Sequence, residues 1–264
     1  MNDKKVAVVF GASKGIGFAT AELFASKGYK VYGVSRSGTS AEGVTAISAD
    51  ITDFSRLNEV YENIYAAEGK IDVVVNNAGL GISGAVEFTT DEQVAKILSL
   101  NFSALEKSCR LAAKYLRETK GKIINLSSVA GALPIPFQSY YTATKAAVLE
   151  FSRAYNLELR PYGVKVCAVL PGDTKTAFTA SRDKNELGAE VYGDRIKRSV
   201  SRMERDETHG VAPIKVAKVV YSLAKAKNPK PYKVVGFGYK FLVVLARLLP
   251  TRLVDYILYS MYAK

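Results

Sequence analysis

The sequence predicts an α/β fold in which a doubly wound parallel sheet of about seven strands carries helices on both faces. Short runs rich in β-branched residues alternate along the chain with stretches of helical period. Runs such as "KVAVVF" and "IDVVVN" are almost continuously apolar, which is typical of strands covered on both faces. No repeat or change of composition divides the 264 residues, so we expect one domain over 1–264.

The predicted elements follow one another in a regular order. Strands are expected at 6–10, 30–35, 44–49, 71–76, 122–126, 164–170 and 232–236. Helical period predicts helices at 20–27, 56–67, 91–117, 143–160 and 214–226. Strands joined through helices pair in parallel, so their carboxyl ends meet at one edge of the sheet.

Two segments stand outside this alternation. The charge-dense interval 177–211 is expected to cover the substrate, and 237–264 is expected to form an apolar helical tail. In the tail, Arg247, Thr251 and Asp255 fall four apart, as on one face of an amphipathic helix. Three uses of the tail remain open: packing on the protein itself, a subunit interface, or contact with a membrane surface. The apolar candidates of the covering interval are Phe178, Val191, Tyr192, Ile196, Val200 and Met203.

Composition narrows the classes of function. The net charge of +12 favours anionic partners, but basic residues do not cluster with stacking aromatics, so we expect no nucleic-acid binding. Cys109 and Cys167 lie in apolar surroundings, which fits buried thiols and a cytoplasmic location. With His209 as the single histidine, in a polar loop, we expect neither a metal site nor Ser-His-Asp chemistry. No stretch approaches the roughly 18 apolar residues of a membrane span.

A glycine-rich turn predicts a dinucleotide site. Gly11, Gly15 and Gly17 directly follow the first strand, at the entrance to the first helix. Glycine there lets the backbone approach a pyrophosphate, whose charge the free N–H groups and the helix dipole stabilise.

The residues after the second strand indicate which dinucleotide is bound. An acidic side chain there would accept a hydrogen bond from a free ribose 2'-hydroxyl, but this chain has Ser35 and Arg36. An arginine suits a 2'-phosphate, and Lys14 adds a second positive charge, so we expect NADP(H). Asp50 follows the third strand and is placed to hydrogen-bond the adenine amino group, while "NNAG" at 76–79 ends the fourth strand.

Six motifs together resemble the short-chain dehydrogenase/reductase family over about residues 6–176: "GASKGIG", "NNAG", "LSLNFSA", "INLSSVAG", "YTATK" and "LPGDTKT". The resemblance implies a Rossmann-like fold and four catalytic residues. Tyr141 is the implied acid/base and Lys145, one helical turn later, its partner. Ser128, thirteen residues before Tyr141, polarises the carbonyl in preference to Ser127, and Asn101 is the fourth member.

The resemblance also implies a nicotinamide-facing segment at 171–176, where Thr174 replaces the family's usual aliphatic residue. The complete expected coenzyme set is Gly11, Ser13, Lys14, Gly15, Ile16, Gly17, Ser35, Arg36, Asp50, Ile51, Asn77, Ala78, Gly79, Tyr141, Lys145, Pro171, Gly172, Thr174 and Thr176.

The chemistry expected of Tyr141 depends on neighbouring positive charge. A phenol has a reference pKa near 10, and lowering it by roughly 3 units requires about 4 kcal/mol of differential stabilisation. We expect Lys145 and the oxidised nicotinamide ring to supply it.

These features predict an NADP(H)-dependent oxidoreductase that interconverts a ketone and a secondary alcohol. Pro134, Phe137 and Tyr140 are expected to form an apolar wall, which favours a steroid-like or lipid-like substrate. A 3-oxoacyl thioester reductase is an alternative within the enzyme class, and a non-catalytic NADP(H)-binding regulator is one outside it. We also expect a homo-oligomer, either a dimer or a tetramer.

Overall fold

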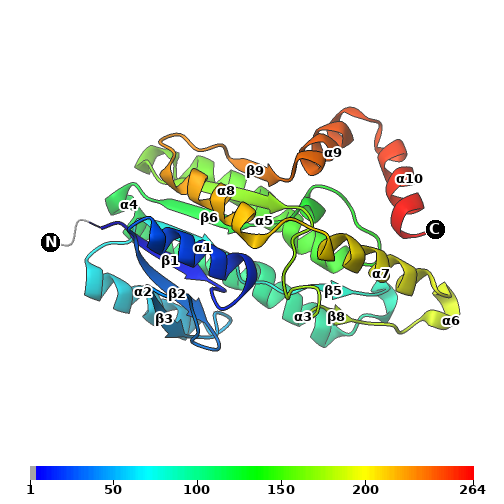
Figure 1. Ribbon diagram of the computed structural model, residues 1–264, viewed down its shortest axis with the longest axis horizontal. Coiled ribbons are helices and arrows are strands. Elements are labelled where there is room, and N and C mark those ends of the chain that lie inside the picture. The colour runs from blue at the N-terminus through cyan, green and yellow to red at the C-terminus, as the bar shows by residue number, and fades with distance from the viewer. Residues whose placement is uncertain (1–3) are drawn as a thin grey trace.

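The computed structural model describes residues 4–264, and its centre is a seven-stranded sheet (Figure 1). The strand order is β3-β2-β1-β4-β6-β7-β9, with all neighbouring pairs parallel. The predicted fold class is therefore confirmed, and each predicted strand occurs close to its expected limits. The strands are β1 (Val6–Phe10), β2 (Lys30–Ser35), β3 (Val44–Ser48), β4 (Val73–Asn76), β6 (Lys122–Leu126), β7 (Lys165–Pro171) and β9 (Tyr232–Val235).

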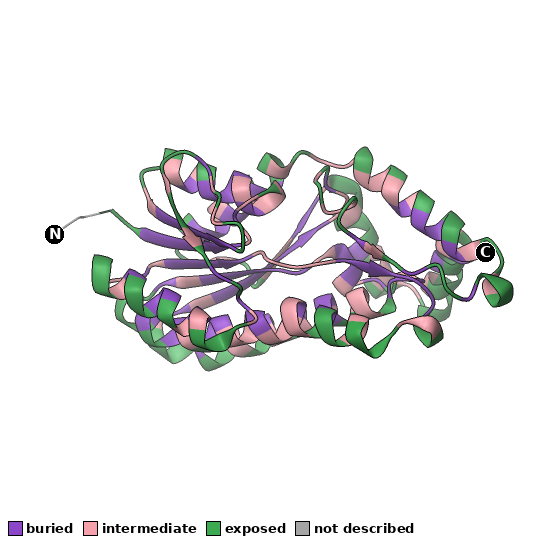
Figure 2. Cartoon of the chain, turned by 90° about the horizontal axis from the view of Figure 1, so that it is seen from below, coloured by how far each residue is buried: buried purple, intermediate pink, exposed green. Residues whose placement is uncertain are grey.

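Helices cover both faces of the sheet and bury two separate apolar clusters. Successive residues of β1 point to opposite sides: Val8 and Phe10 pack into one cluster, and Val9 into the other. Figure 2 shows buried strands between helices whose outward sides are exposed. The covering helices are α1 (Gly15–Ser26), α2 (Phe54–Glu68), α4 (Ala104–Thr119), α5 (Ser139–Glu158) and α8 (Pro213–Lys225), while α3 (Asp91–Leu98) packs against α5.

Local capping chemistry fixes several helix ends. The Asp53 side chain accepts hydrogen bonds from the backbone N–H groups of Ser55 and Arg56 at the start of α2, and Gly69 ends that helix in the left-handed conformation at φ 67°. Thr90 and Gln93 form a capping box at the start of α3.

The helix predicted over 91–117 is interrupted by a π-helical turn, η2 (Ser99–Ser103), between α3 and α4. The helical period of the sequence hides this interruption, because a π-turn inserts one extra residue without a proline or glycine signal. The turn carries Asn101, whose side chain is fully buried.

The covering interval contains its own small elements. β8 (Asp183–Lys184) pairs in parallel with β5 (Ile82–Ser83), outside the main sheet. Helices α6 (Ala189–Tyr192) and α7 (Arg195–Thr208) follow, and the exposed His209 caps the carboxyl end of α7. Three short 3-10 turns complete the chain: η1 (Val86–Phe88), η3 (Val129–Gly131) and η4 (Arg160–Tyr162).

The tail forms two helices, α9 (Phe237–Leu248) and α10 (Thr251–Tyr262), so the expectation of one amphipathic helix through 247–255 is wrong. Pro250 disfavours helical backbone in the residue before it, and Leu249 is accordingly extended, with φ −83° and ψ 151°. Both helices lie beyond β9, at the end of the molecule opposite the N-terminus (Figure 1). Among residues 4–264, no helix has both the length and the apolar content that a membrane crossing requires.

Candidate active site

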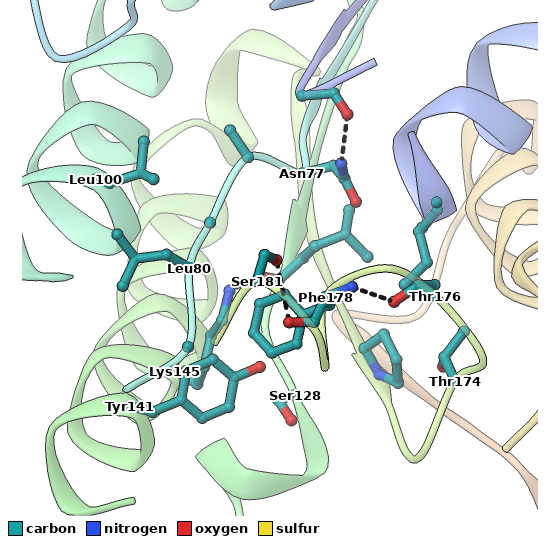
Figure 3. A pocket seen from close by; sticks show the side chains of 18 of the residues that line it. Asn77, Leu80, Leu100, Ser128, Tyr141, Lys145, Thr174, Thr176, Phe178 and Ser181 are labelled. Atoms are coloured by element: carbon teal, nitrogen blue, oxygen red, sulfur yellow. Dashed lines mark hydrogen bonds between the residues drawn. The ribbon is translucent and has the colours of Figure 1, made fainter. Parts of the chain in front are cut away.

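A cavity of about 720 Å³ opens at the carboxyl edge of the sheet and is lined by the loops that follow β1, β2, β3, β4, β6 and β7. The strand order reverses between β1 and β4, and a parallel sheet leaves a crevice at such a point. One end of the cavity holds Arg36 and Asp50, and the other holds Ser128, Tyr141 and Lys145. Figure 3 shows the second end.

The glycine turn after β1 lies where only glycine fits. Gly11 has φ +74°, and a Cβ there would lie 2.8 Å from the Cα of Ala78. A Cβ on Gly17 would lie 2.1 Å from the carbonyl oxygen of Gly11. Gly17 is buried and does not line the cavity, so its part is to let the turn pack against the helix.

The amino end of α1 fits a diphosphate. Lys14 precedes this helix and makes no side-chain cap hydrogen bond, while Gly15 and Ile16 at its first positions line the cavity. The methyl group of Thr176 would lie 3.3 Å from a Cβ on Gly15, so the segment after β7 closes on the turn. Uncapped N–H groups and a helix dipole at this place suit a bound phosphate group.

The nucleoside end of the cavity contains one cation and one carboxylate. Arg36 is exposed and lines the cavity after β2, while Ser35 is buried. Asp50 accepts hydrogen bonds from the N–H and hydroxyl groups of Thr52, and these bonds, with the charge of Arg36, lower the pKa of Asp50. Asp50 is therefore a carboxylate at neutral pH. All the predicted coenzyme residues except Gly17 line this cavity.

The segment after β7 is shaped by its own side chains. The Thr174 hydroxyl donates a hydrogen bond to the carbonyl oxygen of Gly172 at 2.9 Å, and the Thr176 hydroxyl accepts one from the N–H of Phe178 at 3.2 Å. Thr174 thus stabilises its own turn through a hydrogen bond that an aliphatic side chain at this position could not make.

The reaction end is built on α5 and on the loop after β6. Tyr141 lies in the first turn of α5, and the Lys145 ammonium lies 5.7 Å from the centre of its ring. Ser128 lies close enough to Tyr141 to oppose the rise in the pKa of its phenol, and its hydroxyl accepts a hydrogen bond from the N–H of Ala130 at 3.1 Å. The Ser127 hydroxyl instead donates to the carbonyl oxygen of Lys145 at 2.6 Å. The structure therefore places Ser128, and not Ser127, against the phenol.

Burial dominates the ionisation of both groups. Burial raises the pKa of Tyr141 to about 12, although the nearby Ser128 partly opposes it. Burial also lowers the pKa of Lys145 to about 8. In the polypeptide alone, Tyr141 therefore holds its proton at neutral pH and Lys145 its positive charge. Acidification of the phenol by Lys145 together with a bound oxidised coenzyme stays a prediction. The phenol is in the form that donates a proton.

Asn101 supports this end from behind and does not line the cavity. Its amide donates to the carbonyl oxygen of Leu80 and accepts from the Leu80 N–H, both at 2.9 Å, and it donates to the Thr144 hydroxyl at 3.2 Å. A Cβ on Gly79 would lie 3.2 Å from the Asn101 side-chain oxygen and 3.5 Å from the Lys145 nitrogen. Asn101 holds the loop after β4 close to Lys145; its catalytic role stays a prediction.

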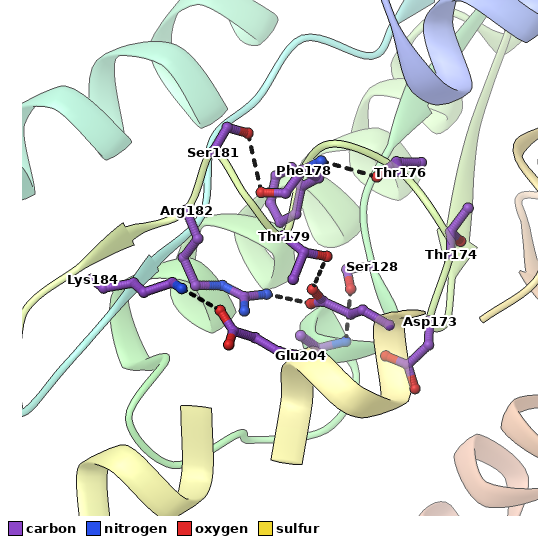
Figure 4. Close-up of polar contacts among 12 residues, drawn as sticks. Ser128, Asp173, Thr174, Thr176, Phe178, Thr179, Ser181, Arg182, Lys184 and Glu204 are labelled. Atoms are coloured by element: carbon purple, nitrogen blue, oxygen red, sulfur yellow. Dashed lines mark hydrogen bonds and ion pairs between the residues drawn. The ribbon is translucent and has the colours of Figure 1, made fainter. Parts of the chain in front are cut away.

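Several residues at the reaction end were not predicted. Glu207 lines the cavity, and its carboxylate pairs with the buried Arg182 and accepts from the Thr179 hydroxyl. Figure 4 shows Arg182 and Thr179 close together, with the ion pair between Lys184 and Glu204 beside them. The Arg182–Glu207 pair could not be predicted from the sequence, because its two residues come together only when α7 packs against the loop before β8. The tail contributes Tyr239, which donates to Asp173, and Tyr262. No sequence signal points from the tail to the cavity.

The apolar candidates of the covering interval are partly correct, whereas the predicted wall of Pro134, Phe137 and Tyr140 is wrong, because none of these three residues lines the cavity. Phe178 and Met203 line the cavity, and the Phe178 and Tyr141 rings lie 5.8 Å apart. Val191 is exposed, while Ile196 and Val200 pack into a separate cluster with Phe137 and Tyr192. Pro134 is exposed and Tyr140 does not line the cavity; Ile135 and Gln138 take their places.

Comparison with known proteins agrees with this geometry. The chain is 36% identical over 264 residues to the 3-ketodihydrosphingosine reductase of Bacteroides thetaiotaomicron, covering 98% of each chain. It is 32% identical over 204 residues to the 3-oxoacyl-(acyl-carrier-protein) reductase FabG of Escherichia coli, covering 73% of this chain and 84% of the relative. The crystal structure of a short-chain dehydrogenase from Streptomyces avermitilis superimposes with a TM-score of 0.84 at 27% identity, covering 94% of this chain and 93% of that one.

The family assignment follows from the extent of these matches. The sequence profile described as short chain dehydrogenase matches residues 5–187, which include the glycine turn, the loop after β6 and the Tyr141–Lys145 pair. The chain therefore belongs to the short-chain dehydrogenase/reductase family and is an oxidoreductase that acts on CH–OH or carbonyl groups.

Proposed function

We propose that this enzyme transfers hydride between NADP(H) and a hydrophobic substrate that carries a ketone or a secondary alcohol. One observation carries the proposal: a single cavity joins the Arg36 end, the uncapped amino end of α1 and the Ser128–Tyr141–Lys145 cluster. A dinucleotide bound along it would present its nicotinamide to the phenol. When bound, the coenzyme supplies the hydride to the carbonyl carbon and accepts it in the reverse direction.

The residues of the chain have distinct tasks in this reaction. Ser128 and Tyr141 hydrogen-bond the substrate oxygen and stabilise the negative charge that grows there during reduction. The Tyr141 hydroxyl then gives its proton to that oxygen, and the resulting phenolate lies beside the Lys145 ammonium. Burial strengthens this attraction, because the local dielectric is low.

Preference for the phosphorylated coenzyme is supported by the charges at the nucleoside end. Arg36 lines the cavity directly after β2, and Lys14 lines it at the glycine turn. Two cations favour the 2'-phosphate of NADP(H), and the carboxylate that would accept from a free 2'-hydroxyl is lacking at position 35 or 36.

The lining of the reaction end supports a long-chain lipid ketone as substrate. Phe178, Met203, Ile135, Tyr239 and Tyr262 give this end an apolar and aromatic lining. The relative with 98% coverage is a 3-ketodihydrosphingosine reductase, and we propose a keto lipid of that kind. The second candidate is a 3-oxoacyl thioester, which the similarity to FabG favours.

We also propose that the enzyme acts in the cytoplasm as a homo-oligomer, and that the tail contacts a membrane surface. The two cysteines are buried free thiols, which fits a reducing compartment. A lipid substrate would be held mainly in a membrane, so a tail that contacts both the cavity and the solvent supports such a contact.

Replacement of the phenol tests the proposed chemistry. In Tyr141→Phe, reduction should fall by about 10²- to 10⁴-fold, because the proton donor is removed, while NADPH still binds. The assay follows NADPH absorbance with long-chain keto lipids and 3-oxoacyl thioesters, and NADPH affinity is titrated separately. Tyr140→Phe is the matched control, since Tyr140 does not line the cavity. Turnover retained in Tyr141→Phe would refute the assigned proton donor.

A further inference from the structure

The two tail helices each have an apolar face that packs and an apolar face that does not. On α9, Tyr239, Val243 and Ala246 recur at helical spacing and pack against the body of the protein. The opposite side of α9 and the outward side of α10 carry exposed side chains, which together we call the outer face. The outer face consists of Phe237, Phe241, Leu242, Val244, Leu248, Leu253, Tyr256, Ile257 and Tyr259.

The outer face is unusually apolar for a protein surface. Two helices of 12 residues each carry more than half of the large apolar side chains that are exposed in residues 4–264. Phe237 is 90% exposed and Leu248 is 77% exposed. Such a concentration of exposed apolar side chains marks a place of contact with a partner or a membrane.

The same helices form part of the reaction cavity. Tyr239 of α9 and Tyr262 of α10 line it together with Tyr141. Arginines of α7 fix α10 in place, since Arg195 donates to the Ala263 carbonyl oxygen at 2.6 Å and Arg202 to that of Met261 at 3.1 Å. The outer face is thus about one helix diameter, roughly 10 Å, from the cavity wall.

We propose that the outer face docks on an anionic lipid bilayer, with α9 and α10 lying in the interface, so that the lipid substrate passes from the bilayer to the cavity. A 12-residue helix is only about 18 Å long, against a hydrocarbon core of about 30 Å, so these helices lie on the membrane and do not cross it. The inference rests on the proposed function for the nature of the substrate, and it adds the surface, its orientation and the lipid charge.

The charges around the outer face favour a bilayer over a second copy of the chain. Lys240, Arg252 and Lys264 are exposed, and Asp255 is the one acidic residue within 237–264. In a twofold contact the same surface meets itself, so these cations would face one another across the interface. Anionic headgroups complement them instead, and the apolar side chains enter the acyl boundary.

A tryptophan reporter tests the docking directly, because the chain contains no tryptophan. Phe241→Trp places one indole on the outer face, and Phe54→Trp, on α2, is the matched control at another exposed phenylalanine. Vesicles of phosphatidylglycerol and phosphatidylcholine should shift the Phe241→Trp emission to the blue and leave the control unchanged. Pure phosphatidylcholine should give weaker binding, and added salt should weaken the anionic case.

A second variant removes the surface without touching the cavity. Phe237→Ser/Phe241→Ser/Leu248→Ser should lower the apparent vesicle affinity more than tenfold, because three exposed apolar side chains are lost. No blue shift with anionic vesicles at low salt would overturn the inference. Emission that is already blue without vesicles, together with a mass in solution that falls on introducing the three serines, would show that a second copy covers this face.

The docking and the chemistry can fail separately. NADPH-dependent reduction of a short, water-soluble ketone measures the chemistry alone, and we expect it to be unchanged in the triple serine variant. Vesicle binding by an enzyme that reduces no carbonyl compound would refute the proposed function and leave the docking intact. Reduction of a carbonyl compound by an enzyme that binds no vesicles would support the proposed function and refute the docking.

Discussion

At the scale of single residues, the buried charge of Lys145 lowers the stability of the folded protein. Its ammonium is buried and donates one hydrogen bond, to the Leu126 carbonyl oxygen at 2.9 Å. Burial lowers its pKa from 10.5 to about 8, which corresponds to about 3 kcal/mol of destabilisation while the group is charged. The charge needed beside Tyr141 is therefore kept at the expense of folding.

Lys145→Met should remove this penalty together with the activity. Below about pH 8 both folded and unfolded wild-type chains hold the proton, so the penalty is complete; it disappears as pH rises from about 8 to 10.5, because the folded chain releases its proton first. Relative to the variant, wild-type stability should rise across that interval. Denaturant unfolding at several pH values measures it, with the exposed Lys218→Met as control. Parallel pH profiles for wild type and Lys145→Met would contradict the prediction.

Arg36→Asp should reverse the coenzyme preference. The new carboxylate repels a 2'-phosphate and accepts from a free 2'-hydroxyl, so NADPH affinity should fall by at least about tenfold while NADH affinity rises. Fluorescence titration with both coenzymes measures the change. Lys30→Asp, at the start of β2 and away from the cavity, controls for the loss of positive charge. Unchanged NADPH affinity in Arg36→Asp would remove the proposed phosphate contact.

At the scale of elements, the pattern of apolar residues along the chain predicted the strands, but it did not predict where helices are interrupted. The seven strands were predictable because their runs are apolar and β-branched. The Tyr141–Lys145 pair was predictable from the resemblance to the family, with which its spacing of one helical turn agrees. The π-turn at Asn101 and the extended Leu249 were not predicted. The first lacks a sequence signal, and the second follows from Pro250, whose steric restriction on the residue before it overrides the helical period of the tail.

The clamp between α7 and α10 could not be predicted, since it joins segments about sixty residues apart. Arg195 and Arg202 hold the last carbonyl groups of the chain, where the α10 dipole favours positive charge. Arg198 donates to the Lys264 carbonyl oxygen at 3.2 Å. This clamp keeps Tyr262 in the cavity wall.

Arg195→Ala/Arg202→Ala should release α10 and open the wall at Tyr262. We expect KM for a long-chain keto lipid to rise about tenfold, with little change in NADPH affinity, because neither arginine lines the cavity and the nucleotide end is built from the loops after β1, β2 and β3. Steady-state kinetics measure both quantities. Arg153→Ala removes an exposed ion pair with Glu150 on α5 and serves as control. An unchanged KM in the double variant would mean that α10 stays docked without the clamp.

At the scale of the whole molecule, the cavity joins both halves of the sheet with the tail. Its nucleotide end follows β1, β2 and β3, and its reaction end follows β6 and β7. The sequence predicted the parts contributed by the strand ends, because the parallel sheet brings those ends together. The wall contributed by Tyr239 and Tyr262 depends on how the tail folds back, which no periodicity specifies.

Because the coenzyme would contact both halves of the sheet, its binding should stabilise the fold as a unit. At a free NADPH concentration about 100 times its Kd, linkage gives about 2.7 kcal/mol, or a rise in Tm of about 5–10 °C for a chain of this size. NADH at the same concentration should raise Tm less, since Arg36 and Lys14 then lack the 2'-phosphate. Differential scanning calorimetry measures both shifts, and the Arg36→Asp variant should lose the difference between them. Equal shifts with NADPH and NADH in the wild type would show that the two cations do not select the coenzyme.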